Sequence, residues 1–172
     1  GNTIMTGTLE VAQMKDSLSG EIYTGNKRNS SALPAGAWYR ILSGGNNIGA
    51  KIVITLGESG NHQYLAFYIS SMFWSRASIT ILSNLFYGGV SSSYYAIDKI
   101  RLAHPTTGYA GIYLDVYIHN ATTANKITVN FTDAYMLDEI YLLDFTVPAS
   151  LTGYQTVEVD INECMFGVKS NN

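Results

Sequence analysis

Acidic and histidine side chains are the residues of this 172-residue chain that could bind a metal ion or transfer a proton. His62, His104 and His119 lie far apart, and the carboxylate at a spacing that suits a shared metal is Asp115, four residues before His119. On a strand this spacing places both side chains on one face, about 13 Å apart at a rise of roughly 3.3 Å per residue. One ion cannot contact both, so we predict a solvated face here, and no metal or other cofactor.

Two catalytic patterns can be tested on the sequence. Residues 57 to 62, GESGNH, resemble a serine nucleophile turn, but the G-x-S-x-G pattern needs a second glycine two residues after the serine and a following helix. Here Gly60 follows Ser59 directly and a strand follows, which predicts a hairpin turn. Carboxylates that could form a glycoside-hydrolysing pair are Asp98, Asp115, Asp138, Glu139 and Asp144. Any sheet with polar faces supplies such pairs, so we expect no catalytic site and a protein that is not an enzyme.

The aromatic residues carry the remaining chemical signal. Thirteen tyrosines and two tryptophans exceed what one core usually needs, and tyrosine joins an apolar ring to a hydroxyl that suits wet interfaces. Residues 84 to 95, NLFYGGVSSSYY, place Gly88 and Gly89 between two aromatic pairs, which lets the backbone turn there. Flat rings can stack on sugars, and an arginine fork can bind an acidic sugar. The predicted ligand-binding residues are Trp74, Arg76, Phe86, Tyr87, Tyr94 and Tyr95.

Other roles for the aromatic residues stay open. The 84 to 95 loop could pack under a neighbouring subunit instead of binding a ligand. The tyrosines outside the loop, which we interpret as cover for a sheet or a subunit interface, are Tyr64, Tyr68, Tyr113 and Tyr117.

Regular alternation from Tyr109 to Asn120 identifies the strand around which the chain is organised. Its apolar positions are Ile112, Leu114, Val116 and Ile118, and its polar positions are Tyr113, Asp115, Tyr117 and His119. Because successive side chains of a strand point to opposite sides, this segment has one dry face and one polar, aromatic face.

Further strands are expected at short intervals. Their ranges are 8–13, 37–43, 49–56, 62–73, 78–82, 95–102, 125–131, 139–147 and 155–161. About ten short strands predict an all-β fold, an antiparallel β-sandwich of jelly-roll type. One helical turn is expected within Thr132–Ile140. We divide the chain into a connector, residues 1–20, and a head domain, residues 21–172.

Composition limits the classes of partner. Charged residues make up 13% of the chain and the net charge is −3, which argues against a nucleic-acid partner. No apolar run approaches the roughly 20 residues that cross a bilayer, so we expect no membrane insertion. The single cysteine, Cys164, excludes an intramolecular disulfide. The chain begins at Gly1 without a methionine, which we interpret as a processed product or a fragment of something longer.

Two short motifs resemble segments of bacteriophage tail fibres. Residues 3 to 9, TIMTGTL, are similar to the "GGTMTGTL" element found where a fibre shaft passes into its next segment, although Asn2 and Ile4 depart from the common form. Residues 33 to 41, LPAGAWYRI, are similar to the "GWYRIA"-type strand near the start of the globular heads of such fibres. The two motifs occur in the expected order and cover about a tenth of the chain.

The resemblance implies a receptor-binding head on the tail fibre of a phage or phage-like particle. Such heads are all-β, are usually trimeric, and recognise a polysaccharide or an outer-membrane protein of a bacterium outside the cell. Neither motif is a binding motif, so it assigns no site residue. We expect a homotrimer formed through the connector and one tyrosine-bearing sheet face. A glycan-degrading depolymerase and a purely structural fibre or baseplate segment remain the alternatives.

Overall fold

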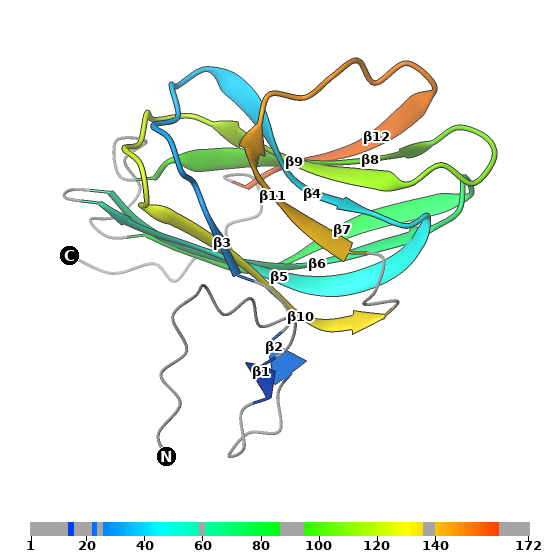
Figure 1. Cartoon of the computed structure of the whole chain (residues 1–172), viewed down its shortest axis with the longest axis horizontal. Helices are drawn as coiled ribbons and strands as arrows, with labels where there is room; N and C mark the ends of the chain where they lie inside the picture. The colour runs from blue at the N-terminus through cyan, green and yellow to red at the C-terminus, as the bar shows by residue number, and fades with distance from the viewer. Residues whose placement is uncertain are drawn as a thin grey trace, which may run out of the picture.

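The strands that the alternation predicts between residues 37 and 161 form two five-stranded antiparallel sheets that face each other, together with a short strand at Asn26–Arg28 that it does not predict (Figure 1). The predicted strand at 8–13 lies outside the described residues. The computed structural model describes residues 14–15, 22–23, 26–58, 61–86, 95–135 and 140–161. In chain order the strands are β1 (Met14–Lys15), β2 (Ile22–Tyr23), β3 (Asn26–Arg28), β4 (Ala37–Gly44), β5 (Asn47–Glu58), β6 (Asn61–Met72), β7 (Arg76–Phe86), β8 (Ile97–Pro105), β9 (Ile112–Ile118), β10 (Ile127–Tyr135), β11 (Ile140–Thr146) and β12 (Tyr154–Asp160). The predicted all-β sandwich is therefore confirmed.

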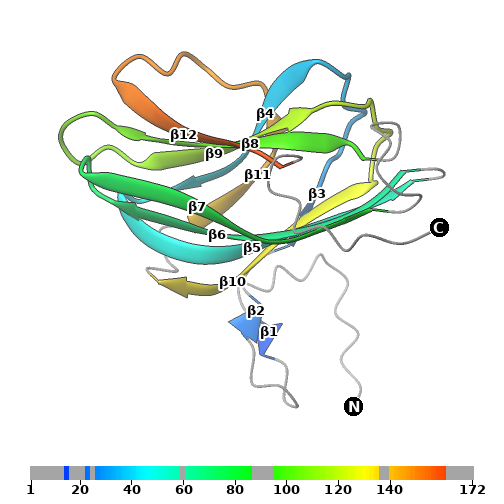
Figure 2. The ribbon, with the colours of Figure 1, turned by 180° about the vertical axis from the view of Figure 1, so that it is seen from behind.

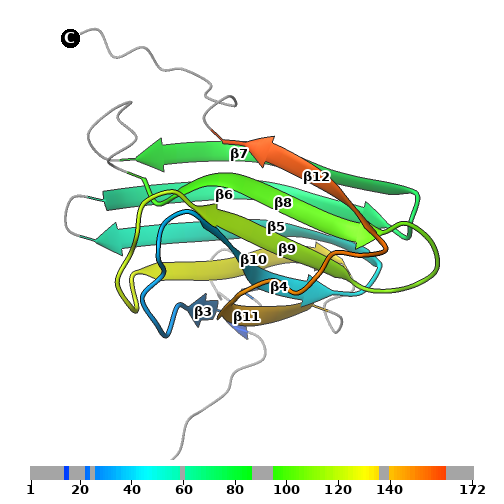
Figure 3. The same ribbon diagram turned by 90° about the horizontal axis from the view of Figure 1, so that it is seen from above.

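The first sheet has the order β3-β10-β5-β6-β7, and the second has the order β11-β4-β9-β8-β12. Seen from above, the strands of the two layers run in similar directions, with β7 beside β12 at one edge and β3 beside β11 at the other (Figure 3). The strand predicted from Tyr109 to Asn120 becomes β9, at the centre of the second sheet. This central position explains why its alternation is so regular, since both of its edges are paired and one face is fully covered.

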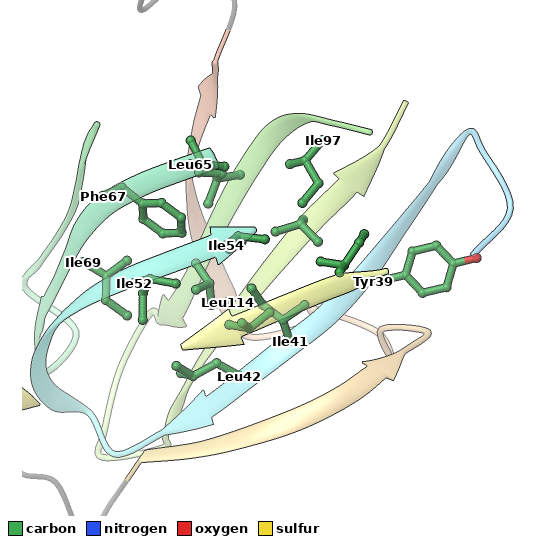
Figure 4. Packing of buried hydrophobic residues seen from close by; sticks show 14 of the residues in the cluster. Tyr39, Ile41, Leu42, Ile52, Ile54, Leu65, Phe67, Ile69, Ile97 and Leu114 are labelled. Carbon is green, nitrogen blue, oxygen red and sulfur yellow. The ribbon is translucent and has the colours of Figure 1, made fainter. Parts of the chain in front are cut away.

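The core fills the space between the two sheets. Ile112, Leu114, Val116 and Ile118 on the dry face of β9 are all fully buried. Leu65, Phe67 and Ile69 of β6 meet them from the first sheet, and Figure 4 shows side chains of both layers in this space.

The predicted helical turn at Thr132–Ile140 is wrong for the residues that can be placed. Residues 132 to 135 continue β10, residues 136 to 139 lie outside the described part, and Ile140 begins β11. Thr132 pairs with Lys51 of β5, and an irregularity follows in which Asp133 has a φ of 48°. Pairing with β5 outweighs the local helical spacing because ladder hydrogen bonds and core burial are both gained in the strand.

The described residues before the sandwich form a strand pair. Met14 of β1 pairs with Tyr23 of β2, and β2 contacts β10. Figure 2 shows this pair beside β10, outside the two stacked sheets. The pair joins residues on both sides of the proposed boundary at residue 20, and that boundary remains a proposal.

The outward face of the second sheet has a buried carboxylate at its centre. Asp115 is completely buried and accepts hydrogen bonds from Arg40 Nε at 2.9 Å and from Arg101 Nη2 at 2.7 Å. Strand register places Arg40 and Arg101 directly beside Asp115 from the two neighbouring strands. The prediction of a solvated face is therefore wrong for Asp115, because the two guanidinium groups replace its water.

Aromatic rings hold these guanidinium groups in place. The guanidinium of Arg40 lies 3.7 Å from the centroid of the Tyr113 ring, and that of Arg101 lies 4.2 Å from a ring centroid of Trp38. Burial, together with Tyr113, raises the pKa of the neighbouring Tyr154 to about 12. The rings of this face thus contact cations of the same chain, and we interpret the face as a structural layer.

The ion triad of Asp115, Arg40 and Arg101 predicts a large loss of stability when the Asp115 carboxylate is removed. Asp115→Ala leaves two guanidinium groups without their carboxylate, which should lower the free energy of unfolding by about 3–5 kcal/mol. The control is Glu158→Ala, because Glu158 is the exposed cross-strand neighbour of Arg101 and should change stability by only about 0.5 kcal/mol. Urea unfolding of the two variants measures both values. Equal losses would show that the triad does not stabilise the sheet.

Candidate functional site

Three aromatic rings gather at one end of the sandwich, and we call them the aromatic cluster. Phe73 and Trp74 lie in the turn between β6 and β7, and Tyr109 lies in the loop between β8 and β9. The ring centroids are 5.9 Å apart for Phe73 and Trp74, and 5.5 Å apart for Tyr109 with each of the others. Trp74 is 41% exposed and Tyr109 is 72% exposed, so the cluster faces solvent although its rings are large and apolar.

Hydrogen bonds fix the turn that carries this cluster. The Phe73 N–H donates to the Asn46 carbonyl at 2.6 Å, and the Ser75 N–H donates to the Met72 carbonyl at 3.1 Å. The Gln155 side-chain amide donates to the Trp74 carbonyl at 2.9 Å. These bonds tie the turn to the β4–β5 connection and to β12, so elements of both sheets support the rings.

The backbone around the cluster also needs unusual conformations. Phe73 has a φ of 50°, which is strained for a residue with a bulky side chain. In the loop between β8 and β9, a Cβ on Gly111 would clash with the Gly44 carbonyl oxygen, so only glycine fits there. Both backbone constraints therefore occur next to the exposed rings of the aromatic cluster.

The geometry suits stacking against a flat apolar surface. Trp74 and Tyr109 meet edge to face at an interplanar angle of 82°. This contact leaves at least one face of each ring uncovered by the other ring. Polar groups lie around the rings. The Asn46 side-chain amide donates to the Tyr109 carbonyl, and Gln155 Nε2 lies 3.5 Å from His104 Nδ1. A ring platform bordered by amides can hold a sugar by its C–H face and its hydroxyls together.

The structure separates the residues that the sequence predicts as one ligand site. Trp74, in the turn before β7, and Arg76, at the start of β7, are exposed, whereas Phe86 ends the strand ten residues after Arg76. At a rise of roughly 3.3 Å per residue, about 33 Å separates Arg76 from Phe86. Tyr95 lies beyond the far end of β7 and is buried, with its ring 5.3 Å from that of His119. Tyr87 and Tyr94 lie outside the described residues.

Phe73 and Tyr109 are the cluster residues that the sequence reasoning missed. The alternation predicts Tyr109 at the start of the central strand, but β9 begins only at Ile112. Gly108, with a φ of 76°, and Gly111 flank Tyr109, and these two glycines were the signal of a loop.

The candidate catalytic carboxylates are engaged in separate structural contacts where they can be placed. Asp115 is buried in the ion triad. Asp98 Oδ2 lies 3.0 Å from His119 Nδ1, and burial raises the pKa of Asp98. Asp144 accepts a hydrogen bond from the Ser30 N–H at 2.8 Å, and hydrogen bonding to Ser30 lowers the Asp144 pKa. Asp138 and Glu139 lie outside the described residues.

Metal-binding clusters and membrane-spanning helices are absent from the part of the chain that the structure describes. Its histidine, cysteine and acidic residues form no group of three that could hold a metal ion. It also contains no helix of a length and hydropathy that would span a bilayer.

Comparison with known proteins gives one weak structural likeness. No protein-family model matches the chain, and no curated protein matches it either. The chain is similar to the tailspike protein gp49 of the Acinetobacter baumannii bacteriophage Fri1, whose crystal structure is described as that of a capsular polysaccharide depolymerase. The identity is 12% and the TM-score is 0.38, with 76% of this chain and 21% of the tailspike chain covered.

That description corrects one prediction from the sequence. We expected a protein that is not an enzyme, and the similar structure belongs to an enzyme, a depolymerase. The expectation of a non-enzymatic protein is therefore withdrawn. A TM-score of 0.38 does not carry the tailspike chemistry over to this chain.

Proposed function

We propose that this chain is the head of a phage or phage-like tail fibre that binds a polysaccharide on the bacterial surface. The observation that carries the proposal is the aromatic cluster of Phe73, Trp74 and Tyr109. Its Trp74 and Tyr109 rings are exposed, and hydrogen bonds from elements of both sheets support it. The tail-fibre-like motifs in residues 3 to 9 and 33 to 41 support the location on the virion, outside the cell.

The cluster favours recognition of a glycan over a purely structural role. Exposing Trp74 and Tyr109 to water forgoes the free energy of burying them, so a role in contact with another molecule accounts for their position. The rings lie in connections between strands, where a rigid sandwich supports contact residues. An outer-membrane protein is the alternative partner, because tyrosine and tryptophan are also frequent in protein interfaces.

The cluster is tested by shortening its two exposed rings. Trp74→Ala and Tyr109→Ala should each weaken binding of the labelled domain to its target bacteria by about 1–3 kcal/mol, as expected for an interface hot spot. The melting temperature should change little, since both rings are exposed. Tyr141→Ala is the matched control, because Tyr141 is 61% exposed on the edge strand β11 and is not a member of the cluster. Unchanged binding in both cluster variants would exclude the site, and no binding to any strain of a broad panel would favour the structural role.

The predicted loop around Tyr87 and Tyr94 is tested in the same assay. If the loop contacts ligand, the double replacement of both tyrosines by alanine should weaken cell binding by about 1–3 kcal/mol and leave assembly intact. If the loop packs under a neighbouring subunit, the same variant should lose assembly instead, as seen by light scattering. Unchanged binding would remove this loop from the site.

Self-association is the third property to be tested. We expect the full chain, with residues 1–20 present, to form a trimer, because the low charge and the shaft-like opening favour a closed cyclic assembly. Multi-angle light scattering at high micromolar concentration should give three times the mass of one chain. The mass of a single chain under those conditions would contradict the expectation.

A further inference from the structure

The outward face of β5, β6 and β7 differs in charge from the rest of the molecule, and we call it the lysine face. Its outward positions, fixed by alternation and register, are Asn47, Gly49, Lys51, Val53, Thr55, Gly57, His62, Tyr64, Ala66, Tyr68, Ser70, Met72, Arg76, Ser78, Thr80, Leu82, Ser83 and Leu85. None of these is acidic, although the chain as a whole has a net charge of −3.

The cations of the lysine face are available to a partner. Lys51 lies beside Tyr68, and Arg76 is exposed at the start of β7. Arg28 of β3 continues the face, since it pairs with Thr128, which pairs with Thr55. None of the three cations forms an ion pair with a described residue, in contrast to Arg40 and Arg101 on the opposite face.

Exposed rings and a groove lie among these cations. Tyr64 and Tyr68 are 41% and 42% exposed, and no cation of the described residues covers either ring as Arg40 covers Tyr113 on the other sheet. An open groove of about 460 Å³ lies at the far end, with Tyr64, Leu85 and His62 among its lining residues. The face therefore offers apolar rings, hydroxyls and positive charge together.

The dimensions of the lysine face favour a polymer over a single sugar. Its central strand, β6, has twelve residues, which at a rise of roughly 3.3 Å span about 40 Å. One end of β6 adjoins the turn that holds Trp74, and the other end reaches the groove. A chain lying along β6 would thus contact the aromatic cluster and the groove at the same time.

A second copy that meets this face through its own lysine face fits less well. Two copies meeting through the same face would bring Lys51, Arg28 and Arg76 of each copy towards one another, with no carboxylate from the outward positions between them. An anionic partner instead gains from every one of these cations.

We propose that the lysine face binds an extended anionic polysaccharide, bearing carboxylate or phosphate groups, that runs along β6 from the aromatic cluster. This inference rests on the proposed function and specifies its ligand. Tyr68 and Tyr64 stack on sugar rings, and Lys51 and Arg76 bind the acidic groups.

The test compares acidic capsular polysaccharides with the same polymers after their carboxylates are reduced to alcohols. Isothermal titration of the full chain should show at least about tenfold tighter binding of an acidic form, as expected for charge-assisted hydrogen bonds. The combined variant Lys51→Ala and Arg76→Ala should lose that preference, and Tyr68→Ala should weaken binding of both forms. Lys99→Ala is the matched control, because Lys99 is a half-buried lysine on the opposite sheet.

Three results would overturn the inference, and they separate it from the proposed function. Equal binding of acidic and reduced polymers, or binding that needs Trp74 but neither Lys51 nor Tyr68, removes the lysine face and leaves the proposed function in place. A change of oligomeric mass in Tyr68→Ala, seen by light scattering, assigns the face to a second copy. Absence of binding to every polymer of the panel removes both proposals.

Discussion

The ion triad at Asp115 is the interaction on which the rest of the molecule depends. A carboxylate completely removed from water costs several kcal/mol unless it is paired, and here Arg40 and Arg101 pair it from both neighbouring strands. These bonds lock the register of β4, β9 and β8, because a shift of one residue would move Asp115 into the apolar core. The three central strands of the second sheet are thereby held in a single alignment.

The ion triad also makes the two outward faces of the sandwich differ. On the second sheet, Arg40 and Arg101 are bound to Asp115 and stacked on Tyr113 and Trp38, so charge and ring surface are used within the chain. On the first sheet, tyrosines are exposed, and Lys51, Arg28 and Arg76 form no ion pair with a described residue. Both faces look polar and aromatic in the sequence, and their difference arises from which residues find partners.

Local sequence patterns predict the strands well, but they do not predict which distant side chains contact one another. Alternation identified β9 and the buried Leu114, because burial on one sheet face requires a period of two. The burial of Asp115 depends on Arg40, 75 residues earlier, and the cluster joins Trp74 to Tyr109, 35 residues later. Such contacts are set by strand order and loop course, which no local spacing encodes. The continuation of β10 through Thr132 has the same cause, since its partner Lys51 lies on another strand.

Net charge does not decide what the lysine face attracts. The carboxylates of Glu158 and Asp160 lie on β12 of the second sheet, and stacked sheets are about 10 Å apart. At physiological ionic strength the screening length is about 8 Å, so charges on the far side of the sandwich are largely hidden from a molecule at the near side. An approaching anion therefore responds mainly to the charges of the first sheet, among them Lys51, Arg28 and Arg76, and a protein with an overall negative charge can still present cations on one face.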